Sequence, residues 1–321
     1  MDLKSLCVAL IAVALGSLGL KQYFKGGTFT SDVRIDGKIV IITGANTGIG
    51  KESAIDLARR GGRIIMACRN QQKADAAAKE VRKEANVADD MVSVEILDLS
   101  SFKSVREFAG RMNSKLSHID ILINNAGVMW TDYTKTVDGN ELQFQVNHLS
   151  HFLLTHLLLD KIKAAPKARI IAVSSLAHER GTIKLDDLNS EKSYGRVEAY
   201  SQSKLANVMF ASALAKRLKG TSVTTYSLHP GAVDTELARY APILSNKYVY
   251  GTLRILIWPF IKTSVEGSQT TNYCALEPSL SNESGKYYSD CAEKKAAPQA
   301  LDVDVEEKLW AASERMVGLK V

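Results

Sequence analysis

The 321-residue sequence predicts an α/β protein in which helices cover both faces of a parallel sheet. Two observations carry this prediction. Short β-branched runs that are apolar on both faces alternate regularly with helical patterns, as a buried parallel sheet requires. A glycine-rich loop also joins the first of these strands to the first helix, and a second strand follows, which completes a β-α-β unit.

The elements of this unit are read directly from the sequence. KIVIITG at 38–44 is the first strand, an amphipathic helix is expected from Ile49 to Arg60, and RIIMAC at 63–68 is the second strand. The alternation then continues along the chain. Further strands are expected at 92–97, 119–125, 168–175 and 222–231, and further helices at 101–115, at 139–163 and around 200–204.

The amino-acid composition is that of a globular protein that is able to bury one large core. It is 45% hydrophobic and 24% charged, and one α/β sheet absorbs about 250 to 300 residues. The formal charge of +6 suits an anionic cofactor or an anionic membrane surface, and it does not imply nucleic acid. The four cysteines have no metal-ligand spacing, so neither a zinc site nor a disulfide framework is expected.

The amino-terminal segment is apolar on all sides. Residues 3–20 would form a helix about 27 Å long, close to the roughly 30 Å hydrocarbon core of a bilayer. A short membrane anchor and a cleaved signal peptide both fit, and the weakly basic start favours the anchor. Lys21 and Lys25 outnumber Lys4, which predicts a cytosolic carboxy-terminal part. We therefore expect an anchor and hinge at 1–27 and a single domain at 28–321.

The glycine-rich loop TGANTGIG has the features of a dinucleotide site. Gly44, Gly48 and Gly50 follow a strand and open a helix, where the backbone approaches a pyrophosphate and the helix amino terminus attracts its charge. Arg69, nineteen residues past Gly50, stands where an acidic residue would bind the ribose of NAD. A guanidinium suits a 2'-phosphate, so the expected cofactor is NADP(H), although a surface arginine would look the same.

Tyr200 and Lys204 are four residues apart in YSQSK, a spacing that places both side chains on one helix face. A neighbouring ammonium is expected to lower the pKa of a tyrosine from its reference value of about 10. Such a tyrosine exchanges protons with a substrate oxygen near neutral pH, which is the chemistry of carbonyls and alcohols. Alone, the same spacing also fits a chance pair on a solvated helix.

Six motifs in order extend this interpretation to a family. TGANTGIG, NNAG at 124–127, Asn147, Ser175, YSQSK and HPG at 229–231 together resemble the short-chain dehydrogenase/reductase family over residues 36 to about 290. The resemblance implies a Rossmann-like three-layer fold with a seven-stranded, mainly parallel sheet and a cofactor at the carboxyl ends of the strands.

The resemblance also implies a role for each matching residue. Tyr200 would be the acid or base, Lys204 would lower its pKa, Ser175 would donate a hydrogen bond to the substrate oxygen, and Asn147 would position a water for proton relay. No metal is implied, because hydride chemistry belongs to the nicotinamide. The expected cofactor-binding residues are Gly44, Asn46, Thr47, Gly48, Ile49, Gly50, Arg69, Asp98, Leu99, Asn125, Ala126, Gly127, Tyr200, Lys204, Pro230, Gly231, Val233 and Thr235.

Substrate choice in such a fold is expected in the apolar segment at 232–263, either as a substrate lid or as a helix packed on the sheet. The chain resembles the retinol dehydrogenase branch in several segments. These are the amino-terminal run, MACRN, AYSQSKLANV, FIKT and YYSDC. That branch implies a membrane-bound enzyme of the endoplasmic reticulum, facing the cytosol, which interconverts retinal and retinol. Reduction of medium-chain or long-chain aldehydes or steroids remains open, and so does a non-catalytic, membrane-tethered nucleotide-binding scaffold.

Overall fold

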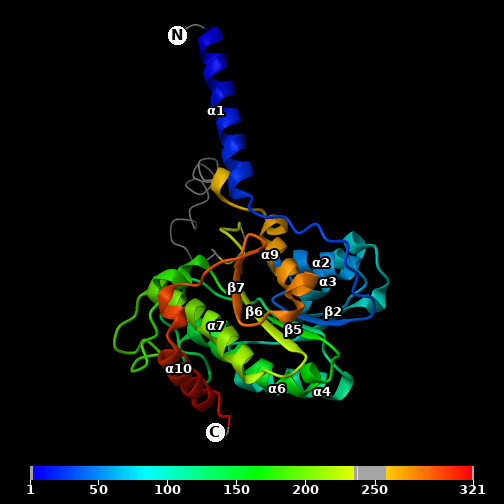
Figure 1. Cartoon of the computed structure of the whole chain (residues 1–321), viewed down its shortest axis with the longest axis vertical. Helices are drawn as coiled ribbons and strands as arrows, with labels where there is room; N and C mark the ends of the chain where they lie inside the picture. Colours follow the sequence, from blue (N-terminus) through cyan, green and yellow to red (C-terminus); the bar gives the residue numbers. More distant parts are fainter. Residues whose placement is uncertain (1–2, 235–236, 238–257, 320–321) are drawn as a thin grey trace.

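The computed structural model describes residues 3–234, 237 and 258–319, and within its first helix it describes the side chains of Ser5 and of the residues from Leu15 onward. A single sheet forms the centre of the molecule (Figure 1), with the strand order β3-β2-β1-β4-β5-β6-β7-β8. The strands are β1 Ile39–Thr43, β2 Arg63–Cys68, β3 Val92–Ile96, β4 Ile121–Asn124, β5 Ala168–Val173, β6 Val223–His229, β7 Lys286–Ser289 and β8 Ala292–Glu293.

The first seven strands pair in parallel, which confirms the predicted Rossmann-like sheet. The predicted count of seven is nevertheless wrong, because β8 adds a short antiparallel strand beside β7. The turn between them consists of Asp290 and Cys291, which have φ angles of 54° and 56°. Two consecutive positive φ angles are typical of the tight hairpin turn that matches the twist of the strands.

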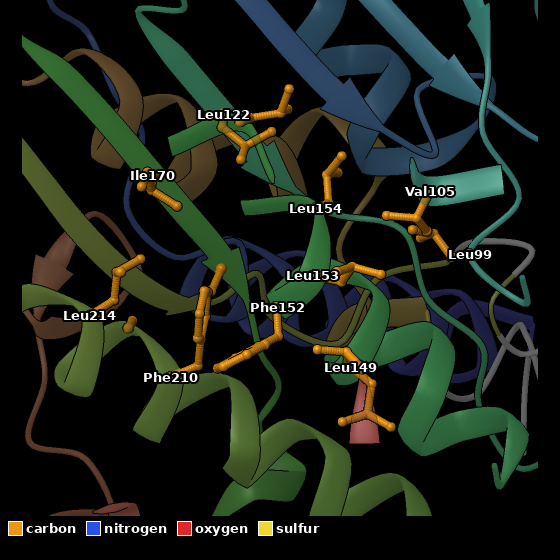
Figure 2. Close-up of a cluster of buried hydrophobic side chains, with 14 of the residues drawn as sticks. Leu99, Val105, Leu122, Leu149, Phe152, Leu153, Leu154, Ile170, Phe210 and Leu214 are labelled. Carbon is orange, nitrogen blue, oxygen red and sulfur yellow. The ribbon is translucent and has the colours of Figure 1, made fainter. Parts of the chain in front are cut away.

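Helices cover both faces of the sheet, as the buried strands require. Two large apolar clusters fill the space between the layers, one on each side. Figure 2 shows part of the first cluster, in which Phe152, Phe210 and Ile170 converge from two helices and a strand. The principal helices are α2 Gly48–Arg59, α3 Gln71–Ala85, α4 Phe102–Lys115, α6 Ser150–Lys163, α7 Arg196–Arg217, α9 Ser264–Leu276 and α10 Val303–Met316.

The long helix expected at 139–163 is divided in the structure. A short α5, Leu142–Phe144, leads into a π-helical stretch at Gln145–Leu149, and α6 continues from Ser150. A π-helical stretch inserts one extra residue into the turn, and such insertions occur frequently at functional sites. Here the widened turn contains Asn147.

The amino-terminal helix α1, Leu3–Phe24, extends away from the body of the molecule (Figure 1). It leads through Gly26 and Gly27 to the first strand region. Among the described residues, no helix is both long and apolar enough to cross a membrane.

Candidate active site

A cavity of about 510 Å³ opens at the carboxyl ends of the central strands. All the sequence-predicted cofactor residues that the structure describes line it, and Thr235 lies outside the described residues. Three of the four expected catalytic residues, Ser175, Tyr200 and Lys204, line the same cavity. The fourth, Asn147, lies behind the lining residue Gly127, where a Cβ added to the glycine would be 3.1 Å from the Asn147 Oδ1 atom.

The glycine loop has the shape that a phosphate group requires. Gly44 and Gly48 have φ angles of +67° and +56°, a region that other residues rarely adopt. A Cβ at Gly50 would lie 2.5 Å from Nδ2 of Asn125 and 2.6 Å from the carbonyl oxygen of Gly44. Thr47 precedes α2 without capping it through its side chain, so backbone N–H groups at this helix start face the loop region. These features fit a bound dinucleotide.

Thr43 connects the loops that follow β1 and β4. Its Oγ1 accepts hydrogen bonds from the backbone N–H groups of Asn125 and Ala126, each at 2.9 Å. In return, Nδ2 of Asn125 donates to the Thr43 carbonyl oxygen at 2.8 Å. The resulting network fixes the floor of the cavity and explains why an amide follows the fourth strand.

The lining of the cavity also includes two cations and an acidic residue. Arg69 follows β2, and Lys73 lies in the first turn of α3; both line the cavity. Sequence reasoning missed Lys73, although a second cation four residues after Arg69 could have indicated the same site. Asp98 accepts hydrogen bonds from the Ser100 N–H and hydroxyl groups at 2.9 and 2.7 Å, which fixes its carboxylate at the cavity wall.

Tyr200 and Lys204 lie on α7 and are buried, with 4% and 3% exposure. Their predicted proximity is confirmed, since the Lys204 Nζ atom lies 5.7 Å from the centre of the Tyr200 ring. Lys204 donates to the Val173 carbonyl oxygen at 3.1 Å, and the Ser174 hydroxyl donates to the Lys204 carbonyl oxygen at 2.6 Å. The end of β5 therefore holds the lysine by both its side chain and its backbone.

Burial is the largest influence on the pKa values of Tyr200 and Lys204. It raises the pKa of Tyr200 to about 12, opposed by a hydrogen bond with Ser175. It lowers the pKa of Lys204 to about 8. The expected lowering of the tyrosine pKa by the neighbouring cation is therefore wrong for this structure, because desolvation disfavours the charged form of both groups. The phenol is protonated at neutral pH and is placed to donate its proton.

Asn147 lies behind the wall of the cavity and holds part of that wall in place. Its Oδ1 accepts from the Val128 N–H at 2.8 Å, while Nδ2 donates to the Val128 carbonyl at 3.0 Å and to the Ser203 hydroxyl at 2.9 Å. The two donated bonds use the whole donor capacity of the amide. The side chain thereby joins the segment after Gly127 to α7 at Ser203, which lies between Tyr200 and Lys204 in the sequence.

Several apolar lining residues were not predicted. Val128, Leu142 and Val146 line the cavity, and so does Leu237, which lies in the segment 232–263 where substrate choice was expected. The first three come from loops and short helices whose positions depend on tertiary packing, so no local pattern distinguishes them from core residues. Their side chains supply an apolar wall that suits an apolar substrate.

The histidines and cysteines do not form a metal site among the described residues. Burial lowers the pKa of His148 to about 3 and of His151 and His229 to about 4, so these rings are neutral. The three cysteines with described side chains, Cys68, Cys274 and Cys291, are free thiols.

Three features together are typical of one class of dehydrogenase. They are the parallel sheet, the glycine loop that fits a phosphate group and the pair of Tyr200 and Lys204. Residues 38–242 match the sequence profile of the short chain dehydrogenases, and the chain belongs to this family. It is an oxidoreductase that acts on CH–OH donors and uses a nicotinamide cofactor.

Within the family, the chain is similar to the retinol dehydrogenases. It is 48% identical to retinol dehydrogenase 13 of Homo sapiens over 97% of this chain and 94% of that protein. It is 43% identical to retinol dehydrogenase 14 of Mus musculus over 99% of both chains. Among solved structures, an uncharacterised protein from Mycobacterium paratuberculosis is 35% identical, with a TM-score of 0.73, over 91% of this chain and 98% of that one.

The fold also matches structures that contain a nucleotide. A short-chain dehydrogenase from Shigella flexneri, solved in complex with NADP, has a TM-score of 0.62 and 20% identity. The match covers 82% of this chain and all of that one. At this identity the likeness concerns the fold alone.

Proposed function

We propose that this protein is an NADP(H)-dependent oxidoreductase that interconverts an apolar carbonyl and its alcohol, with retinal and retinol as the preferred pair. The observation that carries the proposal is a complete Tyr200, Lys204 and Ser175 constellation in a chain 43–48% identical to proteins named retinol dehydrogenases. The apolar wall of Val128, Leu142 and Val146 suits a substrate without polar groups beyond its reacting oxygen.

In this mechanism the chain's own residues handle the proton. The nicotinamide supplies or accepts the hydride when it is bound. Tyr200, held protonated by burial, donates to the carbonyl oxygen during reduction and accepts the proton again during oxidation. The Ser175 hydroxyl donates a second hydrogen bond to the same oxygen as its charge grows.

Lys204 and Asn147 support this step from α7 and from the widened turn. The ammonium of Lys204 faces the Tyr200 ring and stabilises the phenolate that forms as the proton leaves. Asn147 holds Val128 and Ser203 in place, so the cavity wall beside Gly127 keeps its shape. Proton relay through a water near Asn147 remains part of the proposal.

The proposed preference for NADP(H) rests on two cations. Arg69 and Lys73 line the cavity where the second strand ends, and the amino terminus of α3 adds its partial positive charge. A 2'-phosphate would carry about two negative charges into this corner, whereas the ribose hydroxyl of NAD would leave both cations without an anionic partner.

We further propose that residues 1–27 anchor the protein to the endoplasmic reticulum, with the single domain at 28–321 in the cytosol and a substrate lid at 232–263. The apolar run at 3–20 and the excess of Lys21 and Lys25 over Lys4 support this arrangement. Most of the lid lies outside the described residues. Asn282 heads the acceptor sequence NES and is exposed, so its glycosylation in cells would contradict the cytosolic orientation.

The activity is tested with the purified full-length protein, NADPH and all-trans-retinal, by following the absorbance of the reduced cofactor. We expect turnover by the wild type and a loss of about 10²-fold to 10⁴-fold in Tyr200→Phe, which keeps the ring but not the proton. Steroids and aliphatic aldehydes in the same assay define the substrate class. Absence of turnover with every carbonyl in this panel would favour the nucleotide-binding scaffold instead.

A further inference from the structure

The carboxyl end of α1 is attached to a segment far away in the sequence. The Phe24 and Phe260 rings meet edge to face, with their centres 5.0 Å apart. Lys21 Nζ donates to the Ile261 carbonyl oxygen at 2.5 Å and pairs with the Glu266 carboxylate at 3.0 Å. The foot of α1 is thereby fixed to the 3₁₀ turn η6, Trp258–Phe260, and to the first turn of α9.

The start of α9, which α1 contacts, is itself held in place by hydrogen bonds. Thr263 and Glu266 form a reciprocal capping box at the start of α9. The same Glu266 carboxylate that accepts from the Thr263 N–H at 2.8 Å also accepts from Lys21. Both side chains of the Lys21–Glu266 pair are only 15% exposed, so the pair is shielded from solvent screening on most sides. The orientation of α1 relative to the body is therefore defined by polar as well as apolar contacts.

Aromatic side chains remain exposed around this contact. Tyr23 is 81% exposed, Phe24 38%, Trp258 43% and Phe260 45%, and together we call them the aromatic collar. The collar continues into the exposed side chains of α1 above it, which are Leu15, Leu18 and Leu20. Isolated exposed apolar residues are ordinary, but a continuous set drawn from two separate elements marks an interaction surface.

The chemistry of the collar identifies its partner. Tryptophan and tyrosine concentrate where hydrocarbon meets water in a bilayer, because each has an apolar body and a polar edge. Lys25, next to Phe24, lies near the same level and places its charge among phosphate headgroups, whereas the charge of Lys21 is paired with Glu266. The adjoining helix carries the apolar run of the sequence in the direction away from the body (Figure 1). A second protein chain would not require this order of apolar helix, aromatic ring and cation along one axis.

We propose that the aromatic collar lies in the headgroup region of a phospholipid bilayer. The folded body then rests on the membrane at Trp258 and Phe260, and is not merely tethered to it by α1. This inference rests on the proposed membrane anchor and adds a second, independent contact to it. It also places the carboxyl end of the 232–263 segment against lipid, where an apolar substrate is dissolved.

The test uses the full-length protein with phosphatidylcholine and phosphatidylserine vesicles, in which one phospholipid carries bromine near the headgroup end of its chains. Bromine quenches tryptophan fluorescence only at close range. We expect the wild type to be quenched and Trp258→Phe to lose at least half of that quenching. A matched control places a tryptophan at Leu301 in the Trp258→Phe chain, because Leu301 is 56% exposed on the turn η8, Pro298–Leu301, which packs against α7.

The outcomes separate the collar from the anchor. Vesicle binding with quenching that requires Trp258, and with little quenching of the Leu301→Trp control, supports the proposal. Vesicle binding with equal quenching of wild type and Trp258→Phe overturns the proposal and leaves the anchor intact. Protection of Trp258 from aqueous iodide without bromine quenching would mean that a second copy or another protein covers the collar, and this also overturns it. Absence of vesicle binding overturns both ideas, while retinal turnover in detergent would still stand.

Discussion

Replacing Lys204 with methionine should stabilise the folded protein while reducing its activity. Burial lowers the pKa of Lys204 from 10.5 to about 8, which measures how strongly the fold disfavours the ammonium. At about 1.4 kcal/mol for each tenfold change, the buried charge reduces the free energy of unfolding by about 3 kcal/mol at neutral pH. Losing the hydrogen bond to Val173 offsets about 1 kcal/mol of the gain, and Asn207 still donates to that carbonyl at 3.2 Å.

The net gain of about 2 kcal/mol should depend on pH in a defined direction. The folded-state pKa lies below the unfolded-state value, so the unfolded chain holds the proton more tightly. The penalty is therefore present in full below pH 8, and it disappears as the pH rises from about 8 to 10.5. Above that range the wild type should match or exceed Lys204→Met, which lacks the hydrogen bond.

The assay is urea unfolding of both proteins in one detergent, without nucleotide, at pH 7 and pH 10.5. Lys219→Met serves as the control, because Lys219 is exposed in the turn that follows α7, and the stability of this variant should stay within about 0.5 kcal/mol of the wild type. In parallel, carbonyl reduction by Lys204→Met should fall at least about tenfold. A stability difference that is absent at pH 7, or equal at both pH values, would refute the reasoning that a desolvated cation lies beside Tyr200.

Three further outcomes are expected. Because the pKa of Tyr200 is raised to about 12, kcat/KM for alcohol oxidation should rise about tenfold per pH unit between about pH 5 and 7, where Lys204, with a pKa of about 8, keeps its charge, while that for carbonyl reduction stays flat; a pH-independent oxidation rate would contradict this. Arg69→Asp should raise the KM for NADPH at least about tenfold and that for NADH much less, and an unchanged preference would reduce Arg69 to a surface charge. Gly50→Ala should weaken nucleotide binding in a calorimetric titration, because its Cβ would meet the Gly44 carbonyl oxygen at 2.6 Å; Gly110→Ala, with open space around it, should bind normally and gain about 0.5–1 kcal/mol of stability.

Local sequence patterns predicted those parts of the site that depend on backbone conformation. The glycine loop and the strand that precedes it depend on spacing and on β-branched composition, and both lie where the sequence predicted them. Arg69 follows from its distance along the chain, because one β-α-β unit has a nearly constant length. Strand β8 was missed because two residues hold no alternating pattern to detect.

Properties that depend on tertiary packing could not be read from the same patterns. The π-helical turn at Gln145–Leu149 accompanies hydrogen bonds from Asn147 to Val128 and Ser203, which lie 19 and 56 residues away. The direction of the Tyr200 pKa change was wrong for a related reason. A sequence shows that a lysine is near, but only the folded structure shows that both groups are desolvated.

The end of β5 links these observations, because three consecutive residues there reach α7 and the catalytic pair. Val173 accepts from the Lys204 ammonium, Ser174 donates to the Lys204 backbone, and Ser175 bonds to Tyr200. Alternate residues of a strand point to opposite faces, so a slip of one residue in β5 would exchange these contacts. The six paired positions that β5 shares with β6, and the four that it shares with β4, fix the register against such a slip. Helix α7 therefore sets the spacing of Tyr200 and Lys204, and the register of the parallel strands sets where Val173, Ser174 and Ser175 meet that pair.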